Sequence, residues 1–592
     1  MARVRLSCPP FSSTGIQRMH DMGRPPQQPE GVAEQRCPEV PRGNFKGFVH
    51  SMKPDMTAGF LVFLIALPLC LGISVASGFP PIAGVFTAIV GAGVATFLSN
   101  SELTIKGPAA GLIVIVLGAM QALGYTGGQM PAADMHAYRM TLAVGCVAGI
   151  VQIVLGLVRA GVLGDFFPTA VVHGMLAAIG VIIVLKQLPV ALGEKAAAEP
   201  LEILLELPQT IAHLNPDIAL IGGISLLILF GLPVLRSRLG VGWLRLIPAQ
   251  MIVLVVAVAL GMWLQLSHEH TYTFAGHSFP LGPAFLVNVP RTLFAAITTP
   301  DFSVFADPAT RLIGLQWVVM FALVGNLESL LSAKAIDMVD PWKRKTKLNR
   351  DLVAIGVANV AAAAVGGLPM ISEIVRSKAN IDNGAQTRWA NFWHGIFLLG
   401  FIVLVPGLIC QVPLAALAAM LVYTGCRLAS PNEFINVYKI GREQLLIFVS
   451  TIVGVLSTDL LVGVFIGMAV KLSVHVFNGL PIGSMFKPFL EVSVLGEKSI
   501  QIDARGSAVF TNWIPFRRQI TLLGLEQRNS IVVNLEGTRL VDHSVMEGLH
   551  QLQADFEQAG LTLEVIGLGE HQPLSHHPFA TRKRRAQKTL SG

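Results

Sequence analysis

Charged side chains are scarce in this sequence. Only 13% of its 592 residues are Asp, Glu, Lys or Arg, whereas 53% are hydrophobic, and the mean hydropathy is +0.62. Because soluble globular proteins usually carry about 25% charged residues, the composition predicts an integral membrane protein. The net charge of +7 does not indicate nucleic-acid binding, since the basic residues lie in short loops between apolar segments and near the C-terminus, as membrane topology requires.

Motifs for enzymatic chemistry are also missing from the sequence. The six cysteines form no Cys-x-x-Cys pair, and the sequence has no phosphate-binding loop, metal-ligand cluster or nucleophile elbow. Residues 1–51 have no long apolar run, which excludes an ordinary signal peptide. We therefore expect no enzyme activity, no cofactor beyond a coupling ion, and a disordered cytoplasmic tail over residues 1–51.

Apolar segments dominate residues 52–482, which we expect to form a transmembrane transporter domain. Several reach the roughly 17–20 residues needed to cross a bilayer, but the third and the tenth are shorter. The fourteen expected segments cover residues 56–77, 80–98, 108–121, 138–158, 168–187, 217–235, 244–264, 313–332, 351–365, 370–381, 391–409, 412–428, 443–457 and 459–477.

The two short segments are interrupted by glycine and proline. The third opens with Gly107, Pro108, Ala109, Ala110 and Gly111, and the tenth follows Gly367-Leu368-Pro369. Short, interrupted segments at matching places of two halves indicate a solute site between inverted repeats, here seven plus seven. Free N–H groups at such breaks favour an anion, although the glycines could instead serve close helix packing.

Charged residues inside the apolar segments are candidate site residues, because burying one in a membrane costs roughly 2.5–3.5 kcal/mol or more. We expect a new helical turn to carry Ser372, Glu373 and Arg376, with Ser372 and Arg376 binding an anion. Glu373 would accept a proton or hold a cation, or the Glu373–Arg376 pair could simply neutralise itself. Glu328 and Ser332 share a helical face, and Glu328 could accept a proton or help hold a cation; alternatively Glu328 pairs with a neighbouring helix.

Lys and Arg in the loops predict the orientation. The loop from Lys343 to Arg350 is strongly basic, whereas the loop at 188–216 is mainly acidic. The positive-inside rule then places both termini in the cytoplasm and the protein in the inner membrane.

The pattern changes near the C-terminus. Short strands are expected at 499–502, 507–510, 530–535 and 561–566, and an amphipathic helix at 545–559, so residues 490–570 predict a small α/β domain. Ser544 and Glu547 fit a capping box, which makes Ser544 a helix cap; a phosphorylation switch is the alternative. Residues 571–592 are expected to form a basic tail.

The Asp55–Gly59 stretch, the Gly-Pro and Gly-Gly-Leu-Pro breaks and the Asp542-His543-Ser544 motif together resemble the SulP family of anion transporters, which end in a STAS domain. The resemblance implies an all-α polytopic membrane fold, in which a core domain (segments 1–4 and 8–11) moves like an elevator against a gate domain (5–7 and 12–14). It also implies an anion site between helices three and ten, a homodimer, and a cytoplasmic STAS domain that could bind a partner.

The resemblance also suggests residue roles. Arg376 matches a basic residue of helix ten at the family's anion site, and Glu328 and Ser332 fall where sodium-coupled bicarbonate transporters have an acidic residue and a threonine. Glu373 departs from the family, since many relatives have a small or hydroxyl residue there, and Val545 replaces the usual STAS glycine.

The expected function is secondary active transport of a small inorganic oxyanion, sulfate or bicarbonate, coupled to sodium or protons. Two alternatives stay open: a proton-coupled symporter of a dicarboxylate or nucleobase, and a non-transporting membrane anchor for a regulatory STAS domain.

Overall fold

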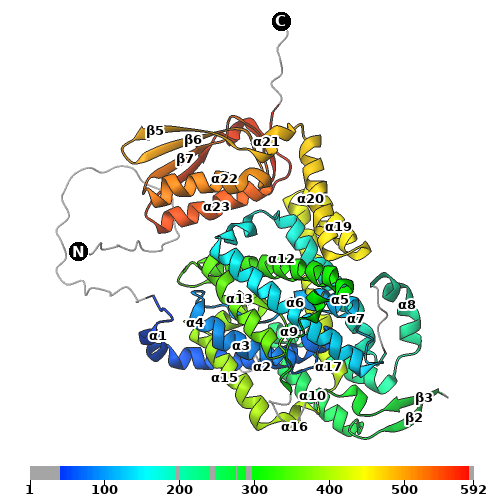
Figure 1. Ribbon diagram of the computed structural model, residues 1–592. Coiled ribbons are helices and arrows are strands. Elements are labelled where there is room, and N and C mark those ends of the chain that lie inside the picture. Colours follow the sequence, from blue (N-terminus) through cyan, green and yellow to red (C-terminus); the bar gives the residue numbers. More distant parts are fainter. Residues whose placement is uncertain (1–39, 195–199, 240–246, 275–276, 289–295, 586–592) are drawn as a thin grey trace.

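The computed structural model describes residues 40–194, 200–239, 247–274, 277–288 and 296–585. A bundle of apolar helices forms most of the chain, and an α/β domain lies at one end of this bundle (Figure 1). Seven of the described helices are long and apolar enough to cross a membrane. The prediction of a helical, polytopic membrane protein with a C-terminal α/β domain is therefore confirmed.

Each expected apolar segment coincides with a helix of the bundle. In chain order these are α2 (Met52–Ala76), α3 to α4 (Ala83–Leu98), α5 (Ile113–Ala122), α6 (Pro131–Leu157), α7 (Thr169–Ala191), α9 (Pro216–Leu239), α10 (Ala249–Trp263), α12 (Pro308–Val339), α13 (Leu348–Ala364), α14 (Ile374–Asp382), α15 (Trp389–Leu404), α17 (Leu414–Leu428), α19 (Arg442–Ser457) and α20 (Leu460–Phe477). The expected eleventh segment, residues 391–409, comprises α15 and the short helix α16 (Pro406–Ile409). The elements that were not predicted are the hairpin β2–β3 (His270–Phe274 and His277–Leu281) and the helices α1 (Phe45–His50), α8 (Pro200–Ala212), α11 (Ser303–Ala306), α18 (Pro431–Ile440) and α21 (Ile482–Phe486).

The two interrupted segments meet as a pair of short strands. Strand β1 (Ile105–Pro108) pairs antiparallel with β4 (Met370–Glu373), so that Gly107 lies opposite Ile371. Within a membrane these main-chain groups have no water to bond to, and pairing with each other satisfies them. The expected helical turn carrying Ser372 and Glu373 is therefore wrong: both residues belong to the strand, and α14 begins at Ile374.

A second contact also joins matching segments of the two halves. Gly180 of α7 and Gly425 of α17, in the fifth and twelfth segments, face each other so closely that a Cβ on either would lie 2.6 Å from the other's carbonyl oxygen. Side-chain-free positions let two membrane helices approach in this way. Segments five and twelve, like three and ten, are seven apart, as the seven-plus-seven organisation requires.

The α/β domain is built on one mixed sheet. Its strand order is β10-β11-β8-β6-β7-β9, with β5 (Phe489–Gly496) also pairing with β6 (Ser499–Ala508). The helices α22 (Phe510–Thr521) and α23 (His543–Gln558) lie between this sheet and the helical bundle (Figure 1). The remaining strands are β7 (Ser530–Asn534), β8 (Thr538–Val541), β9 (Leu563–Ile566), β10 (His571–Pro573) and β11 (Arg582–Arg584).

Three expectations about this part of the chain need correction. The expected strand at 507–510 is the end of β6 followed by the first residue of α22. The expected basic tail contributes β10 and β11, and β11 pairs with β8 inside the sheet. Helix α23 is capped by Asp542, whose carboxylate accepts from the Val545 N–H, and not by Ser544.

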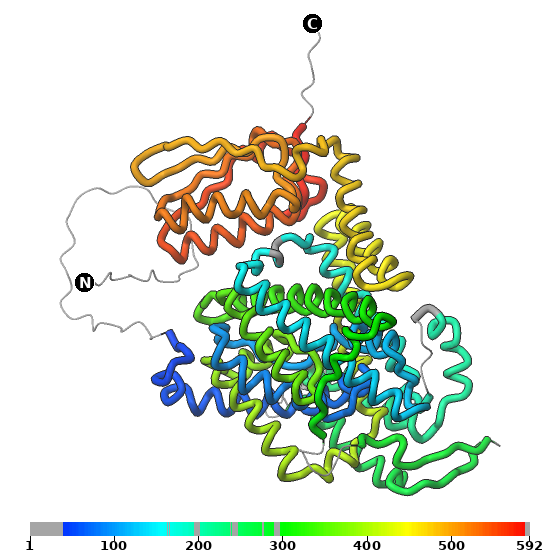
Figure 2. The backbone as a smooth tube through the Cα atoms, viewed as in Figure 1, coloured from blue at the N-terminus to red at the C-terminus, as the bar shows by residue number. Residues whose placement is uncertain are grey.

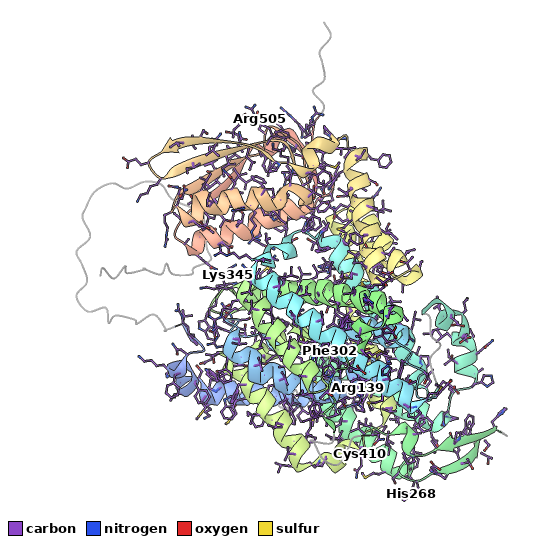
Figure 3. All side chains as sticks on the ribbon, in the orientation of Figure 1. Arg139, His268, Phe302, Lys345, Cys410 and Arg505 are labelled. Atoms are coloured by element: carbon purple, nitrogen blue, oxygen red, sulfur yellow. The ribbon has the colours of Figure 1, made fainter. Side chains whose placement is uncertain are left out.

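The chain ends are only partly described. Residues 1–39 and 586–592, which hold most of the expected N-terminal tail and the end of the basic tail, lie outside the described residues. From α20 the chain passes directly into the α/β domain (Figure 2). Lys345, from the basic loop, lies beside that domain, whereas His268 and Cys410 lie at the opposite end of the bundle (Figure 3).

Candidate functional site

The main chain of the break before β4 is hydrogen-bonded by side chains from three other helices. The Tyr138 hydroxyl donates to the carbonyl of Gly366 over 2.7 Å, and the Thr87 hydroxyl donates to that of Leu368 over 3.0 Å. Asn359 accepts from the Met370 N–H and donates to its carbonyl. Gly366 has φ +91°, a conformation that favours glycine. The break is thus a stable, hydrogen-bonded structure at the centre of the bundle.

A buried ion pair supports β1 and β4 on the face that points away from the cavity described below. The Lys106 ammonium on β1 contacts both carboxylate oxygens of Asp351 on α13, at 2.8 and 2.9 Å, and donates to the Ser372 hydroxyl. Ser99 also donates to Asp351. Because side chains alternate along a strand, Ser372 points to this ion pair while Ile371 and Glu373 point to the other face. Ser372 therefore supports the strand pair and does not line the cavity.

Arg376 joins α14 to β1. Its Nη2 donates to the carbonyl of Pro108 over 3.2 Å and its Nη1 to the Cys70 sulfur over 3.4 Å, while Nε has no hydrogen-bond partner. The residue is only 1% exposed. A Cβ at Gly107 would come within 2.7 Å of Nη1, so the glycine leaves room for the guanidinium. Gly107 and Pro108 thus position Arg376.

Glu328 on α12 is a buried carboxylate without a partner. Neither of its side-chain oxygens has a hydrogen-bond donor, and the residue is 6% exposed. It lies directly against the start of the third segment, since a Cβ at Gly111 would come within 2.0 Å of Oε1. Among the described residues, no side chain of a neighbouring helix pairs with Glu328. A buried carboxylate without a partner is available to a proton or cation.

Glu373 is the second carboxylate of this region. Its Oε1 is buried without a partner. Although it precedes Arg376 by three residues, Glu373 lies at the end of β4 and Arg376 lies on α14. No hydrogen bond or direct ion pair joins these two described side chains, although the charge of Arg376 still acts on the Glu373 carboxylate through space.

A cavity of about 210 Å³ brings most of the predicted site residues together. It is bordered by the start of the third segment, α12, β4 and α14 on one side and by α7, α10 and α17 on the other. The predicted residues along it are Ala109, Ala110, Glu328, Ser332, Glu373 and Arg376. Gly107, Pro108 and Ser372 do not border it.

Several residues that line the cavity were missed by sequence reasoning, among them two aromatic or charged residues and a glutamine. Gln250, Tyr423 and Arg427 border it from α10 and α17, and the Arg427 guanidinium lies 6.0 Å from the centre of the Tyr423 ring. Arg427 alone offered a sequence signal, as a charged residue that still falls within the apolar segment 412–428.

Comparisons with known proteins agree with this architecture. The family model described as the sulfate permease family matches residues 52–451. The chain belongs to the sulfate permease family. It is thus an integral membrane anion transporter rather than an enzyme.

Relatives of this sulfate permease family member include a putative sulfate transporter, YvdB, of Bacillus subtilis (strain 168). The two are 26% identical over 430 residues, which cover 72% of this chain and 74% of the relative. The fold is similar to the overall structure of SLC26A9, with a TM-score of 0.63 and 16% identity over 88% of this chain and 85% of that one. It is also similar to the transmembrane domain of a cyanobacterial bicarbonate transporter, BicA, with a TM-score of 0.57 and 22% identity over 71% of this chain and 98% of that one.

The C-terminal domain of this family member is consistent with a STAS domain, and its Asp542 is fully buried. The carboxylate accepts from the Phe510 and Val545 N–H groups and lies 3.2 Å from the Lys471 ammonium of α20. Burial pushes the pKa of Asp542 upward, but Lys471, His475 and the Val545 N–H outweigh it and hold the pKa well below its usual value. Lys471 also donates to the Ser544 hydroxyl over 2.9 Å. Ser544 thus lies at a junction between membrane helix and domain.

Proposed function

We propose that the chain is a secondary active transporter of a small inorganic oxyanion, sulfate or bicarbonate, which binds in the cavity beside Arg376. The observation that carries this proposal is the buried guanidinium, which is fixed on the Pro108 carbonyl and has an unpartnered Nε. The N–H groups at the starts of α5 and α14 add partial positive charge, worth about 0.3–2 kcal/mol at each helix end. Two similar proteins, the putative sulfate transporter YvdB and the bicarbonate transporter BicA, are named for such anions.

Coupling to a cation follows from the two carboxylates. If Glu328 and Glu373 were both ionised, they would repel an anion in the same cavity. A proton on Glu328 or Glu373, or a sodium ion held by Glu328 and the Ser332 hydroxyl, neutralises one of the two carboxylates and so reduces this repulsion. Anion and cation therefore bind together, and the gradient of the cation drives uptake. Alternating access would come from elevator-like movement of the core domain (α2–α6 and α12–α15) against the gate domain (α7–α10 and α17–α20).

An organic substrate is the second candidate. Much of the cavity lining is apolar, with Leu69, Ile73 and Val375 among its residues, and apolar walls favour a dicarboxylate or nucleobase over a hydrated inorganic ion. Competition of labelled sulfate uptake by fumarate and by uracil separates the two candidates. The third possibility, a non-transporting anchor for the STAS domain, predicts no flux of any of these solutes.

Orientation and assembly complete the proposal. We propose that the helical bundle lies in the inner membrane, with both termini, the basic loop and the α/β domain in the cytoplasm. We also propose that the protein is a homodimer and that its STAS domain binds a cytoplasmic partner. The ion pair between Lys345 and Asp555, at 2.7 Å, supports placing loop and domain on one side.

The test is uptake of labelled sulfate and bicarbonate into proteoliposomes under imposed sodium or proton gradients. We expect gradient-driven uptake by the wild-type chain and its loss in Arg376→Gln. The matched control is Arg505→Gln, because Arg505 is exposed on the α/β domain and pairs with the exposed Glu491. Wild-type uptake that persists in Arg376→Gln would contradict the proposed site.

A further inference from the structure

A second cavity lies between the candidate site and the α/β domain. Its volume is about 230 Å³, and its walls come from α7, α12 and the domain helix α23. From α23 it is bordered by Ser544, Glu547 and Gln551, and from α12 by Lys334. We call this cavity the vestibule.

Three apolar side chains separate the vestibule from the site cavity. Leu176 of α7, Leu331 of α12 and Ile374 at the start of α14 border both cavities. The two spaces therefore adjoin at an apolar neck, with α7 on the gate side and α12 and α14 on the core side. A shift of core against gate would change the width of this neck.

The α/β domain is fastened to the gate side of the vestibule by buried or half-buried contacts. Thr169 at the start of α7 donates to the Glu547 carboxylate over 2.8 Å, and Lys471 of α20 pairs with the buried Asp542. The core side reaches the domain through the ion pair of Lys345 with Asp555, in which the lysine side chain is 49% exposed. Helix α23 is thus a fixed part of the gate-side wall.

We propose that the vestibule is the route of the anion between its site and the cytoplasm, and that α23 of the α/β domain forms a wall of this route. This inference rests on the proposed function. The domain then acts on transport directly, because the charge of its own side chains changes the local concentration of anion at the neck. The carboxylate of Glu547, which borders the vestibule, opposes the passage of an anion.

The test uses Gln551→Cys, whose thiol can be modified to carry a positive, neutral or negative group on the wall of the vestibule. Full-length protein in proteoliposomes is treated with methanethiosulfonate reagents that add a positive, a neutral or a negative group, and complete labelling is verified by mass spectrometry. Relative to the neutral group, the positive group should raise labelled-anion uptake about twofold to fivefold and the negative group should lower it by a similar factor. The wild-type chain with the same reagents gives the baseline for its native cysteines.

The matched control is Glu557→Cys, at an exposed position of the same helix that does not border the vestibule. Its labelling should leave uptake independent of the sign of the added charge. Full labelling of the cysteine at 551 with uptake independent of that sign overturns the inference. This failure differs from failure of the proposed function, in which wild-type uptake is absent or survives Arg376→Gln.

Glu547→Gln gives a second measurement without reagents. Removing the carboxylate charge while keeping an acceptor for Thr169 should raise the initial rate of uptake about twofold or more at low ionic strength, with a smaller gain at high salt. A folded variant whose uptake rate equals that of the wild type at both ionic strengths contradicts the inference.

Discussion

The guanidinium of Arg376 donates to the carbonyl of Pro108 over 3.2 Å, across more than 260 residues of intervening sequence. This contact joins the third and tenth segments, whose breaks also pair as β1 and β4. Under the proposed function, an anion bound to Arg376 would act on both half-segments at once.

We expect that a lysine at position 376 does not support anion binding as the native arginine does. Arg376→Lys keeps the charge but loses the planar group that reaches Pro108 and Cys70 together. Because hydrogen bonds to charged groups contribute about 1.5–3 kcal/mol, we expect KM for the anion to rise about tenfold or more. Initial uptake rates over a range of anion concentrations measure this, and an unchanged KM would argue against a positioned guanidinium.

Gly111→Ala should displace the Glu328 carboxylate, because the added Cβ would lie 2.0 Å from Oε1. We expect gradient-driven uptake to fall about tenfold or more while the protein still folds. Gly93→Ala is the control, since a Cβ there meets nothing within 4 Å. Uptake and thermal unfolding of both variants are compared, and equal uptake by the two would contradict the assigned role of Glu328.

The Lys106–Asp351 pair should behave as a buried structural ion pair. Asp351→Asn leaves the ammonium uncompensated and should cost about 3–5 kcal/mol, whereas Lys106→Met combined with Asp351→Leu should recover much of this loss. Thermal unfolding in detergent measures both. Ser372→Ala should leave KM for the transported anion unchanged, since the Ser372 hydroxyl faces the ion pair. A raised KM would show that Ser372 takes part in anion binding.

Asp542 should make the α/β domain resistant to moderate acid. Its folded pKa lies below the unfolded value, so its contribution to stability is full above the unfolded pKa and is lost only as pH falls through the folded pKa. We expect the domain's resistance to proteolysis to be constant from about pH 5 to 8 as far as this group is concerned. Asp542→Asn should lower the free energy of unfolding of the domain by about 3–5 kcal/mol at all these pH values. The domain of this variant should therefore be cleaved faster by protease. Wild-type-like resistance of the variant would contradict the role of this ion pair.

Much of the bundle could be predicted because long apolar segments with glycine and proline at their breaks are local signals. Strands β1 and β4 could not, because each has four residues and pairs with a strand from the other half of the chain. Missing the strands also misplaced Ser372, since a strand turns successive side chains to opposite faces. Arg427 was missed because its place in the cavity depends on how α17 packs against the core.

The α/β domain shows a similar limit. Asp542 and Ser544 are both good helix caps, and Lys471 contacts both of them. Asp542 is the cap because its carboxylate accepts from the Val545 and Phe510 N–H groups, whereas Ser544 already lies inside α23. Strand β11 consists of three basic residues, Arg582–Arg584, which have no strand signal of their own and are ordered by pairing with β8 and β10.

Equilibrium binding of the anion to the purified chain is the most direct test of the site at Arg376. Isothermal titration with sulfate and with bicarbonate, at low pH or with sodium present, should show binding to the wild-type chain and to Arg505→Gln. For Arg376→Gln the account predicts no measurable binding of the anion that the wild type binds. An unchanged Kd in a folded Arg376→Gln variant would contradict it.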